Sequence, residues 1–230
     1  MKRQLNVFLL LVIFLVAVQT MVFAQVTILY QDSFSGSPEE YLAGRVPEIS
    51  YTGQGWISPL IPALVNWQAD GTTERPVDNH NRNAFLPFVP EAGKVYRLSL
   101  EVNPTEGNAP AEWFGVGFTA DCPQTTIFAH DTVGAGPWIL QSWDRSLPSN
   151  TFTGPGTAGE ARHPAASGWV KLEIVLDTTR EDWRAEWYYN GELVRTYLYW
   201  GNPTINYVGF GAMRQAAGQV RNFLLTVEER

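Results

Sequence analysis

Short segments in which apolar and polar residues alternate, separated by Gly and Pro, constrain the fold more than any other feature. Residues 94–102 (KVYRLSLEV) and 169–177 (WVKLEIVLD) carry an apolar side chain at every second position. A period of two residues is typical of a strand with one buried face. No segment of ten or more residues shows the 3.6-residue apolar period of an amphipathic helix. The pattern predicts an all-β protein built from antiparallel sheets, with little helix.

A hairpin is the clearest local signal. Residues 182–190 and 192–200 are joined at Asn190-Gly191, a dipeptide that readily takes the positive φ angles of a type I′ turn. The stretch from Leu147 to Gly168 is rich in Pro, Gly, Ser and Thr, and we expect it to be a loop at one edge of the fold. Further strands are expected where β-branched and aromatic residues gather, at 26–34, 84–88, 112–119, 137–142, 205–212 and 219–227.

The first 24 residues have the features of a secretory signal peptide. Lys2 and Arg3 precede an apolar run over residues 7–18, and small or neutral residues end the segment at Ala24. The alternative is an uncleaved membrane anchor, but a run of about 12 apolar residues is short for a bilayer that needs about 20. We expect cleavage before Gln25, secretion to the periplasm or the medium, and no membrane span in the mature chain. Residues 25–230 are then a single domain.

Composition excludes several classes of protein. The 9 Trp, 9 Tyr and 12 Phe supply ample apolar surface for a core, so the chain is not disordered. A net charge of −7 disfavours nucleic acid as a partner. Cys122 is the only cysteine, which excludes a disulfide within the chain.

A resemblance to a known class rests on three strings and on the opening of the chain. The strings AFLPFVPEAGKVYRLSLEV, EWFGVGFT and INYVGFGAMRQAAGQVRNFLLTV, together with YQDSF, YLAGRVP and an ADG turn, resemble secreted jelly-roll domains of the concanavalin A-like lectin/glucanase class, including laminin-G-like modules. The resemblance implies a two-sheet antiparallel jelly-roll sandwich. It leaves function open, because the class contains lectins, carbohydrate-binding modules, glucanases and polysaccharide lyases.

Catalytic motifs of that class are missing from the sequence. The E-x-D-x-x-E motif of laminarinase-type hydrolases does not occur, and Asp182 and Glu186 would lie roughly 13 Å apart along one strand, too far for a catalytic pair. Neither the R-x-E-L-R nor the Q-I-H string of alginate lyases occurs. These absences favour a non-catalytic protein, while an atypical hydrolase or lyase stays open as an alternative.

Metal sites and cofactors are not indicated. The three histidines, at positions 80, 130 and 163, fall in loop-like contexts without ligand spacing, and we expect them to face solvent or to cap turns. Related sandwiches hold calcium near a closing D-N-F motif, as the resemblance implies. Here the motif reads Arg221-Asn222-Phe223, which predicts no metal at that place and an ion pair of Arg221 with a carboxylate such as Asp32.

Aromatic residues next to planar polar groups are the best candidates for a ligand site. A sugar ring stacks its apolar face on Trp or Tyr, while its hydroxyls need partners such as Asn, Gln, Asp and Arg. Trp183 and Trp187 could form such a platform or belong to the core. We expect the outward face of this hairpin and the neighbourhood of the long loop to bind a polysaccharide or a cell-surface glycan through Trp138, Trp143, Asp144, Arg145, Arg184, Glu186, Tyr188, Arg195, Tyr197 and Tyr199. A structural envelope or matrix protein without a discrete ligand is the alternative.

Overall fold

A computed structural model shows how these segments assemble. It describes residues 25–58, 60, 65–75, 79–106, 112–123, 128–131, 134–142, 144, 147–154, 157–160 and 168–229. The expected signal peptide, residues 1–24, lies outside this range. Across the described part of the chain, no helix has the length and apolar character needed to cross a membrane.

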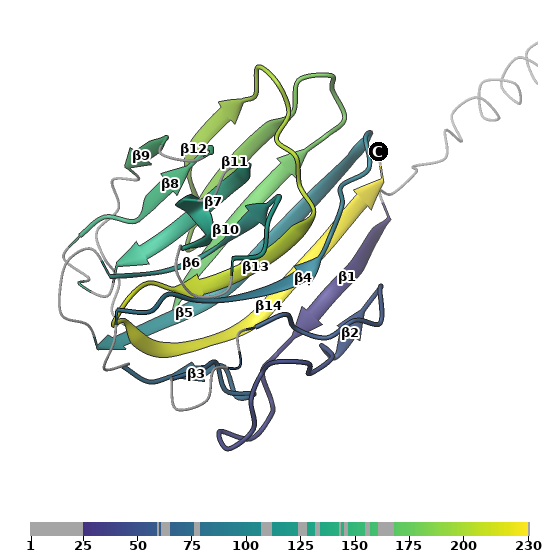
Figure 1. Cartoon of the computed structure of the whole chain (residues 1–230). Helices are drawn as coiled ribbons and strands as arrows, with labels where there is room; N and C mark the ends of the chain where they lie inside the picture. Colours follow the sequence, from purple (N-terminus) through teal and green to yellow (C-terminus); the bar gives the residue numbers. More distant parts are fainter. Residues whose placement is uncertain are drawn as a thin grey trace, which may run out of the picture.

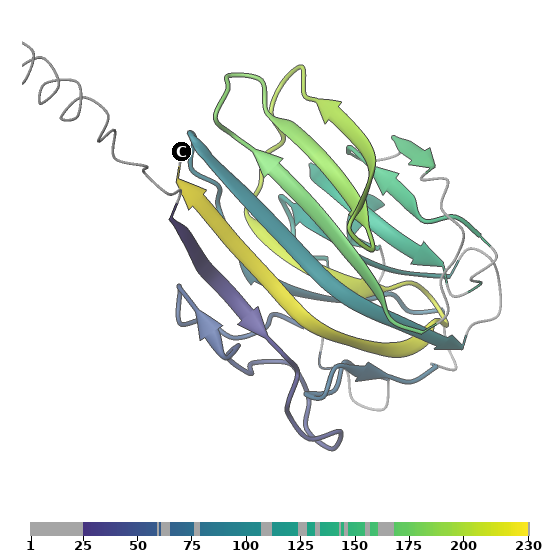
Figure 2. The same cartoon turned by 180° about the vertical axis from the view of Figure 1, so that it is seen from behind.

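Two antiparallel sheets form a sandwich (Figures 1 and 2). The larger sheet has eight strands. Its strands follow the order β12-β11-β10-β5-β14-β1-β2, and β3 also pairs with β14. Their bounds are β1 Val26–Asp32, β2 Ile49–Ser50, β3 Thr72–Thr73, β5 Lys94–Glu106, β10 Val170–Asp177, β11 Arg184–Tyr189, β12 Glu192–Leu198 and β14 Ala217–Glu229. The first and last strands of the domain, β1 and β14, therefore lie side by side.

The smaller sheet has six strands in the order β4-β13-β6-β7-β8-β9. Their bounds are β4 Arg82–Pro87, β6 Trp113–Thr119, β7 Ala135–Ser142, β8 Asn150–Phe152, β9 Ala158–Glu160 and β13 Tyr207–Ala212. One short 3-10 helix, Ala129–Asp131, is the helical element of the described residues. The all-β prediction is confirmed. The expectation of a continuous loop over residues 147–168 is wrong in part, because β8 and β9 extend the smaller sheet there.

The core lies between the two sheets and follows the period of two. On β5, Leu98 and Leu100 are fully buried, and on β10 Leu172 and Ile174 are fully buried as well. The indole of Trp187 crosses the sandwich and donates a hydrogen bond to the Trp138 carbonyl, 2.9 Å away on β7 of the other sheet. Alternation along each strand thus divides the chain into a core-facing and an outward-facing set.

The outer face of the smaller sheet is covered as well. Gly115 and Gly117 on β6 leave room on this face for the side chains of Leu140 and Trp138 from β7. Phe128, which precedes the 3-10 helix, packs against the ring of Trp138 at 5.9 Å between centroids. This second apolar cluster contrasts with the outer face of the larger sheet, where polar side chains predominate.

The β11–β12 hairpin turns at Asn190-Gly191 as predicted, with φ of 49° and 84° at the two residues. Its register then shifts between Trp187 and Tyr188. Tyr188 pairs with Leu193 but Trp187 pairs with Arg195, so Val194 is an extra residue on β12. Such a β-bulge reverses which face each following residue of the strand presents.

Candidate functional site

The outer face of the larger sheet carries a row of side chains across four neighbouring strands, polar on the first three strands and apolar on the fourth. The register places Tyr188 of β11 opposite Glu173 of β10, and Glu173 opposite Ser99 of β5. Ser99 in turn is opposite Leu224 of β14. Residues that are opposite in an antiparallel ladder share one face, with Cβ atoms roughly 5 Å apart. One row of side chains therefore runs across the strands, from the hairpin toward β1.

Opposite charges are paired along this face. Glu173, only 6% exposed, accepts from both Arg97 and Lys171, with Lys171 Nζ 2.8 Å from its Oε2. Arg184 is paired with Glu186 on β11. Tyr188 donates a hydrogen bond from its phenol to Glu186 at 2.6 Å. The face thus presents charged groups that already hold one another in place.

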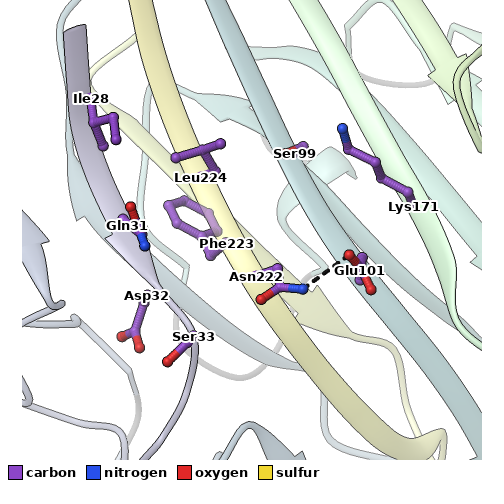
Figure 3. Close-up of a pocket in the computed structure, with 10 residues that line it drawn as sticks. All are labelled: Ile28, Gln31, Asp32, Ser33, Ser99, Glu101, Lys171, Asn222, Phe223 and Leu224. Atoms are coloured by element: carbon purple, nitrogen blue, oxygen red, sulfur yellow. Dashed lines mark hydrogen bonds between the residues drawn. The ribbon is translucent and has the colours of Figure 1, made fainter.

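A pocket of about 330 Å³ opens on the same face near β1 and β14 (Figure 3). Its lining combines apolar side chains with amide, hydroxyl, carboxylate and ammonium groups, from Ile28, Gln31, Asp32, Ser33, Ser99, Glu101, Lys171, Asn222, Phe223 and Leu224. Nine of these residues come from β1, β5, β10 and β14, and Ser33 directly follows β1. The mixture of apolar side chains and a few planar polar groups is typical of small-ligand sites.

A bulge on β14 shapes the wall of this pocket. The register shifts between Arg221 and Leu224, and Asn222 has a φ of 55°. Its side-chain amide donates to Glu101 Oε1 at 3.0 Å (Figure 3). Left-handed backbone at a residue with a side chain is uncommon, although Asn tolerates it better than most. The bulge gives this strand a bend at which an amide group faces the pocket.

An aromatic ring lies next to the pocket. Arg221 donates from Nε to Glu101 Oε2 at 2.7 Å, and its guanidinium carbon lies 4.1 Å from the ring centroid of Trp169. Burial alone would raise the pKa of Glu101, but the hydrogen bonds from Asn222 and Arg221 and the positive charges of Arg221 and Lys171 outweigh it and lower the pKa. Glu101 is therefore an ionised acceptor at neutral pH.

The hairpin residues expected from the sequence divide between the two faces. Arg184, Glu186 and Tyr188 lie on the outer face as expected, partly exposed. Arg195 and Tyr197 do not extend that face, because the extra residue Val194 reverses the parity of β12 and places them opposite Trp187 and Ala185.

Arg195 and Tyr199 lie at the edge of the core instead. Arg195 reaches across to the smaller sheet and donates to the hydroxyl of Thr151 at 3.1 Å. Tyr199 is 5% exposed, and burial raises its pKa far above the usual value. From the sequence, Trp187 could belong either to a ligand platform or to the core. The structure places it in the core, where it is fully buried.

Near the long loop the expectation of exposed rings is wrong for Trp138. Its side chain is fully buried under the second apolar cluster, and its indole donates to the Phe118 carbonyl at 2.9 Å. Asp144 is partly exposed. Trp143 and Arg145 lie outside the described residues.

One expectation about charged groups is wrong, and a second holds only in part. His130 does not face solvent but is buried, 6% exposed, beside Phe152. Arg221 pairs with a carboxylate as expected, but the partner is Glu101 and not Asp32. Asp32 is instead fully buried and accepts from Arg45 and from the indole of Trp56. Among the described residues, no group of three or more His, Cys, Asp or Glu side chains is arranged to hold a metal ion.

Sequence reasoning missed several residues that the structure brings to the pocket. Glu101, Lys171 and Asn222 lie on three different strands, and only the register of the sheet brings them together. One signal was available: Trp169 immediately precedes a strand whose outward positions are polar, so an aromatic ring at the end of that face was foreseeable.

Comparisons with known proteins agree with this architecture. No family model and no curated protein matches the chain. An endo-1,3-β-glucanase from Streptomyces sioyaensis superposes with a TM-score of 0.56 at 12% identity, over 89% of this chain and 97% of its own. A Bacillus subtilis protein of unknown function with a galectin-like fold gives 0.55 at 11% identity, over 90% of this chain and 100% of its own. The carbohydrate recognition domain of Emp47p gives 0.52 at 12% identity, covering 87% and 97%.

These likenesses define the fold alone, because the identities are so low. The chain is a jelly-roll sandwich of the galectin-like and concanavalin A-like architecture.

Proposed function

We propose that this protein binds carbohydrate through the pocket on the outer face of its larger sheet. The observation that carries the proposal is the pocket itself, whose lining combines the polar side chains of Gln31, Asn222 and Glu101 with the apolar side chains of Ile28 and Leu224. Sugars present hydroxyls around an apolar ring face, and such a lining supplies partners for both. Two of the structures with the same fold, a glucanase and a carbohydrate recognition domain, carry names that refer to carbohydrate, which supports the proposal by analogy.

Trp169 extends the pocket as an aromatic neighbour. Arg221 covers one side of its ring and is itself held by Glu101, so the indole is fixed in orientation. A ring that is fixed before binding costs less conformational entropy when a ligand stacks on it. This arrangement favours recognition of a sugar next to the pocket.

The same face supports binding without turnover. A lyase would need a deprotonated base, but the hydrogen bond to Glu186, together with burial, raises the pKa of Tyr188 above its usual value and keeps the phenol protonated. Glu186 is itself paired with Arg184. We therefore propose a non-catalytic binding module, and we expect no release of reducing ends or unsaturated products from any polysaccharide that it binds.

Secretion is part of this proposal. Residues 1–24 have the composition of a signal peptide, and a protein that binds polysaccharide needs access to it outside the cell. The intact mass of the protein recovered from the medium or periplasm should correspond to a chain that begins at Gln25. A mass that includes Met1 would contradict the assignment.

The Asn222→Gly variant tests the site most sharply. Glycine takes the left-handed backbone of the bulge without strain, so the variant removes the side-chain amide and its hydrogen bond to Glu101 while the bulge itself is kept. We expect a loss of about tenfold in affinity, which corresponds to about 1.4 kcal/mol, the size of a typical hydrogen bond. Affinity electrophoresis in gels that contain neutral polysaccharides measures it.

Asn190→Gly is the matched control. Asn190 also has a left-handed φ, 49°, and lies at the tip of the β11–β12 hairpin, outside the pocket lining. Its side chain accepts only from the backbone amide of Lys171, and the backbone bond from Asn190 N to the Lys171 carbonyl is kept in the variant. It should bind like the unmodified protein. Equal retardation of the unmodified protein and Asn222→Gly in every gel would contradict a role for this pocket.

A further inference from the structure

We propose that the pocket selects uncharged sugar units, without carboxylate or sulfate groups, over acidic ones. The inference rests on the carbohydrate binding proposed above and names the chemical class of its ligand. It follows from how the charges of the pocket and of its surroundings are already partnered.

The cations on this face are held by carboxylates of the protein. Lys171 and Arg97 both pair with Glu173, which is almost fully buried. If an acidic sugar drew these cations away, a buried carboxylate would be left without a partner, which costs several kcal/mol. Lys171 and Arg97 therefore stabilise Glu173 rather than offering a free positive charge to a ligand.

Arg221 is engaged on two sides. Its Nε donates to Glu101 at 2.7 Å while its guanidinium lies over Trp169. The carboxylate of Glu101 also accepts from Asn222 at 3.0 Å and lines the pocket. An acidic ligand would have to approach this ionised group, and like charges at short distance repel.

The remaining lining groups suit hydroxyls. Gln31 and Asn222 each carry a carbonyl oxygen and an amide nitrogen, and Ser99 carries a hydroxyl. A sugar hydroxyl both donates and accepts, so it can bind to amides and also donate to the carboxylate of Glu101. The overall charge of −7 acts in the same direction, since it repels polyanions at low salt.

Matched pairs of polysaccharides separate charge from backbone chemistry. The pairs with a common backbone are hydroxyethyl cellulose with carboxymethyl cellulose and dextran with dextran sulfate. Galactan and agarose are added as further neutral probes, and polygalacturonate and carrageenan as further acidic ones. All are used in affinity electrophoresis at 20 mM and 500 mM NaCl. We expect retardation by at least one neutral member, weaker or no retardation by its acidic partner, and less than a twofold change with salt. Preferential binding of an acidic member that is lost at 500 mM NaCl would overturn the inference and leave carbohydrate binding intact. No retardation by any member would overturn the proposed function, and the inference with it.

A charge variant gives a second readout that does not depend on whether a neutral polysaccharide is bound. Glu101→Gln removes the negative charge that pairs with Arg221 and lies opposite Lys171, while an acceptor oxygen is kept. It should therefore gain salt-sensitive retardation by dextran sulfate, at least threefold above the unmodified protein. Glu192→Gln makes the same change in net charge at the tip of the β11–β12 hairpin and should gain none. Equal gains in both variants, or none in Glu101→Gln, would show that Glu101 does not exclude anions.

Discussion

Asp32 shows how one buried charge fixes the start of the domain. Its Oδ1 accepts from the Phe34 amide, and its two oxygens accept from Arg45 at 2.8 and 2.6 Å. Its Oδ2 also accepts from the Trp56 indole at 2.8 Å. A fully buried carboxylate with this many donors holds the segment that follows β1 against the edge of the core.

The Asp32→Ala variant should therefore lose about 3 to 5 kcal/mol of unfolding free energy, since Arg45 and the indole of Trp56 would lose their acceptor. Urea denaturation measures this. Glu181→Ala, which truncates an exposed side chain, should change stability by less than about 0.5 kcal/mol and serves as the control. A similar small change in Asp32→Ala would contradict the account.

His130 predicts how stability depends on pH. Burial lowers its pKa, and the nearby charge of Asp131, whose Oδ1 lies 3.0 Å from Nε2, opposes this only in part. The unfolded chain has a histidine pKa of about 6.5. As the pH falls through that value the unfolded state takes up a proton that the folded state resists, so stability present above about pH 6.5 is lost at lower pH.

Urea denaturation at pH 7.5 and pH 5.5 should show this loss, and it should be smaller in His130→Gln. The reference pKa of Asp and Glu side chains is about 4, below this window. Identical pH dependence in both proteins would show that His130 does not contribute.

At the scale of the element, strand pairing determines which residues meet. A two-residue turn at Asn190-Gly191, continued without interruption, would place Arg195 opposite Glu186 on the outer face. The bulge at Val194 instead pairs Arg195 with Trp187. Alternation predicts that a strand has two faces, but a single extra residue is not visible in its sequence, and it reverses the assignment. The hairpin was predictable from its turn dipeptide. The face of the sheet on which Arg195, Tyr197 and Tyr199 lie was not, because it depends on the bulge.

The close packing of β6 against Trp138 gives a prediction at this scale. A Cβ at Gly117 would lie 2.6 Å from the Pro137 carbonyl oxygen and closer still to the Trp138 ring. Gly117→Ala should therefore lower the unfolding free energy by about 2 to 3 kcal/mol, as overpacking does. At Gly154 the nearest atom would be 3.5 Å away, so Gly154→Ala should be nearly neutral in the same urea titration. Equal stability of the two variants would contradict this packing.

At the scale of the whole molecule, the fold could be predicted from the sequence because the period of two recurs in segment after segment. The residues of the site were harder to predict. Glu101, Lys171 and Asn222 are far apart in the chain and meet through the register of three strands. Trp138 was wrongly predicted to be exposed. Both faces of the smaller sheet are buried, and the alternation of residues along a strand does not show that its outer face is also covered by apolar residues. Arg184, Glu186 and Tyr188 were placed correctly because they alternate with the core residues Ala185 and Trp187.

The central claim is that the outer face of the larger sheet binds a glycan, and nuclear magnetic resonance with a bound neutral oligosaccharide tests it most directly. We expect the side-chain amide signals of Gln31 and Asn222 and the indole signal of Trp169 to shift on titration. The indole of Trp200, which is 87% exposed at the far end of the hairpin, should not shift and is an internal reference. Shifts confined to Trp200 or to Trp143, with Gln31, Asn222 and Trp169 unchanged, would contradict the claim.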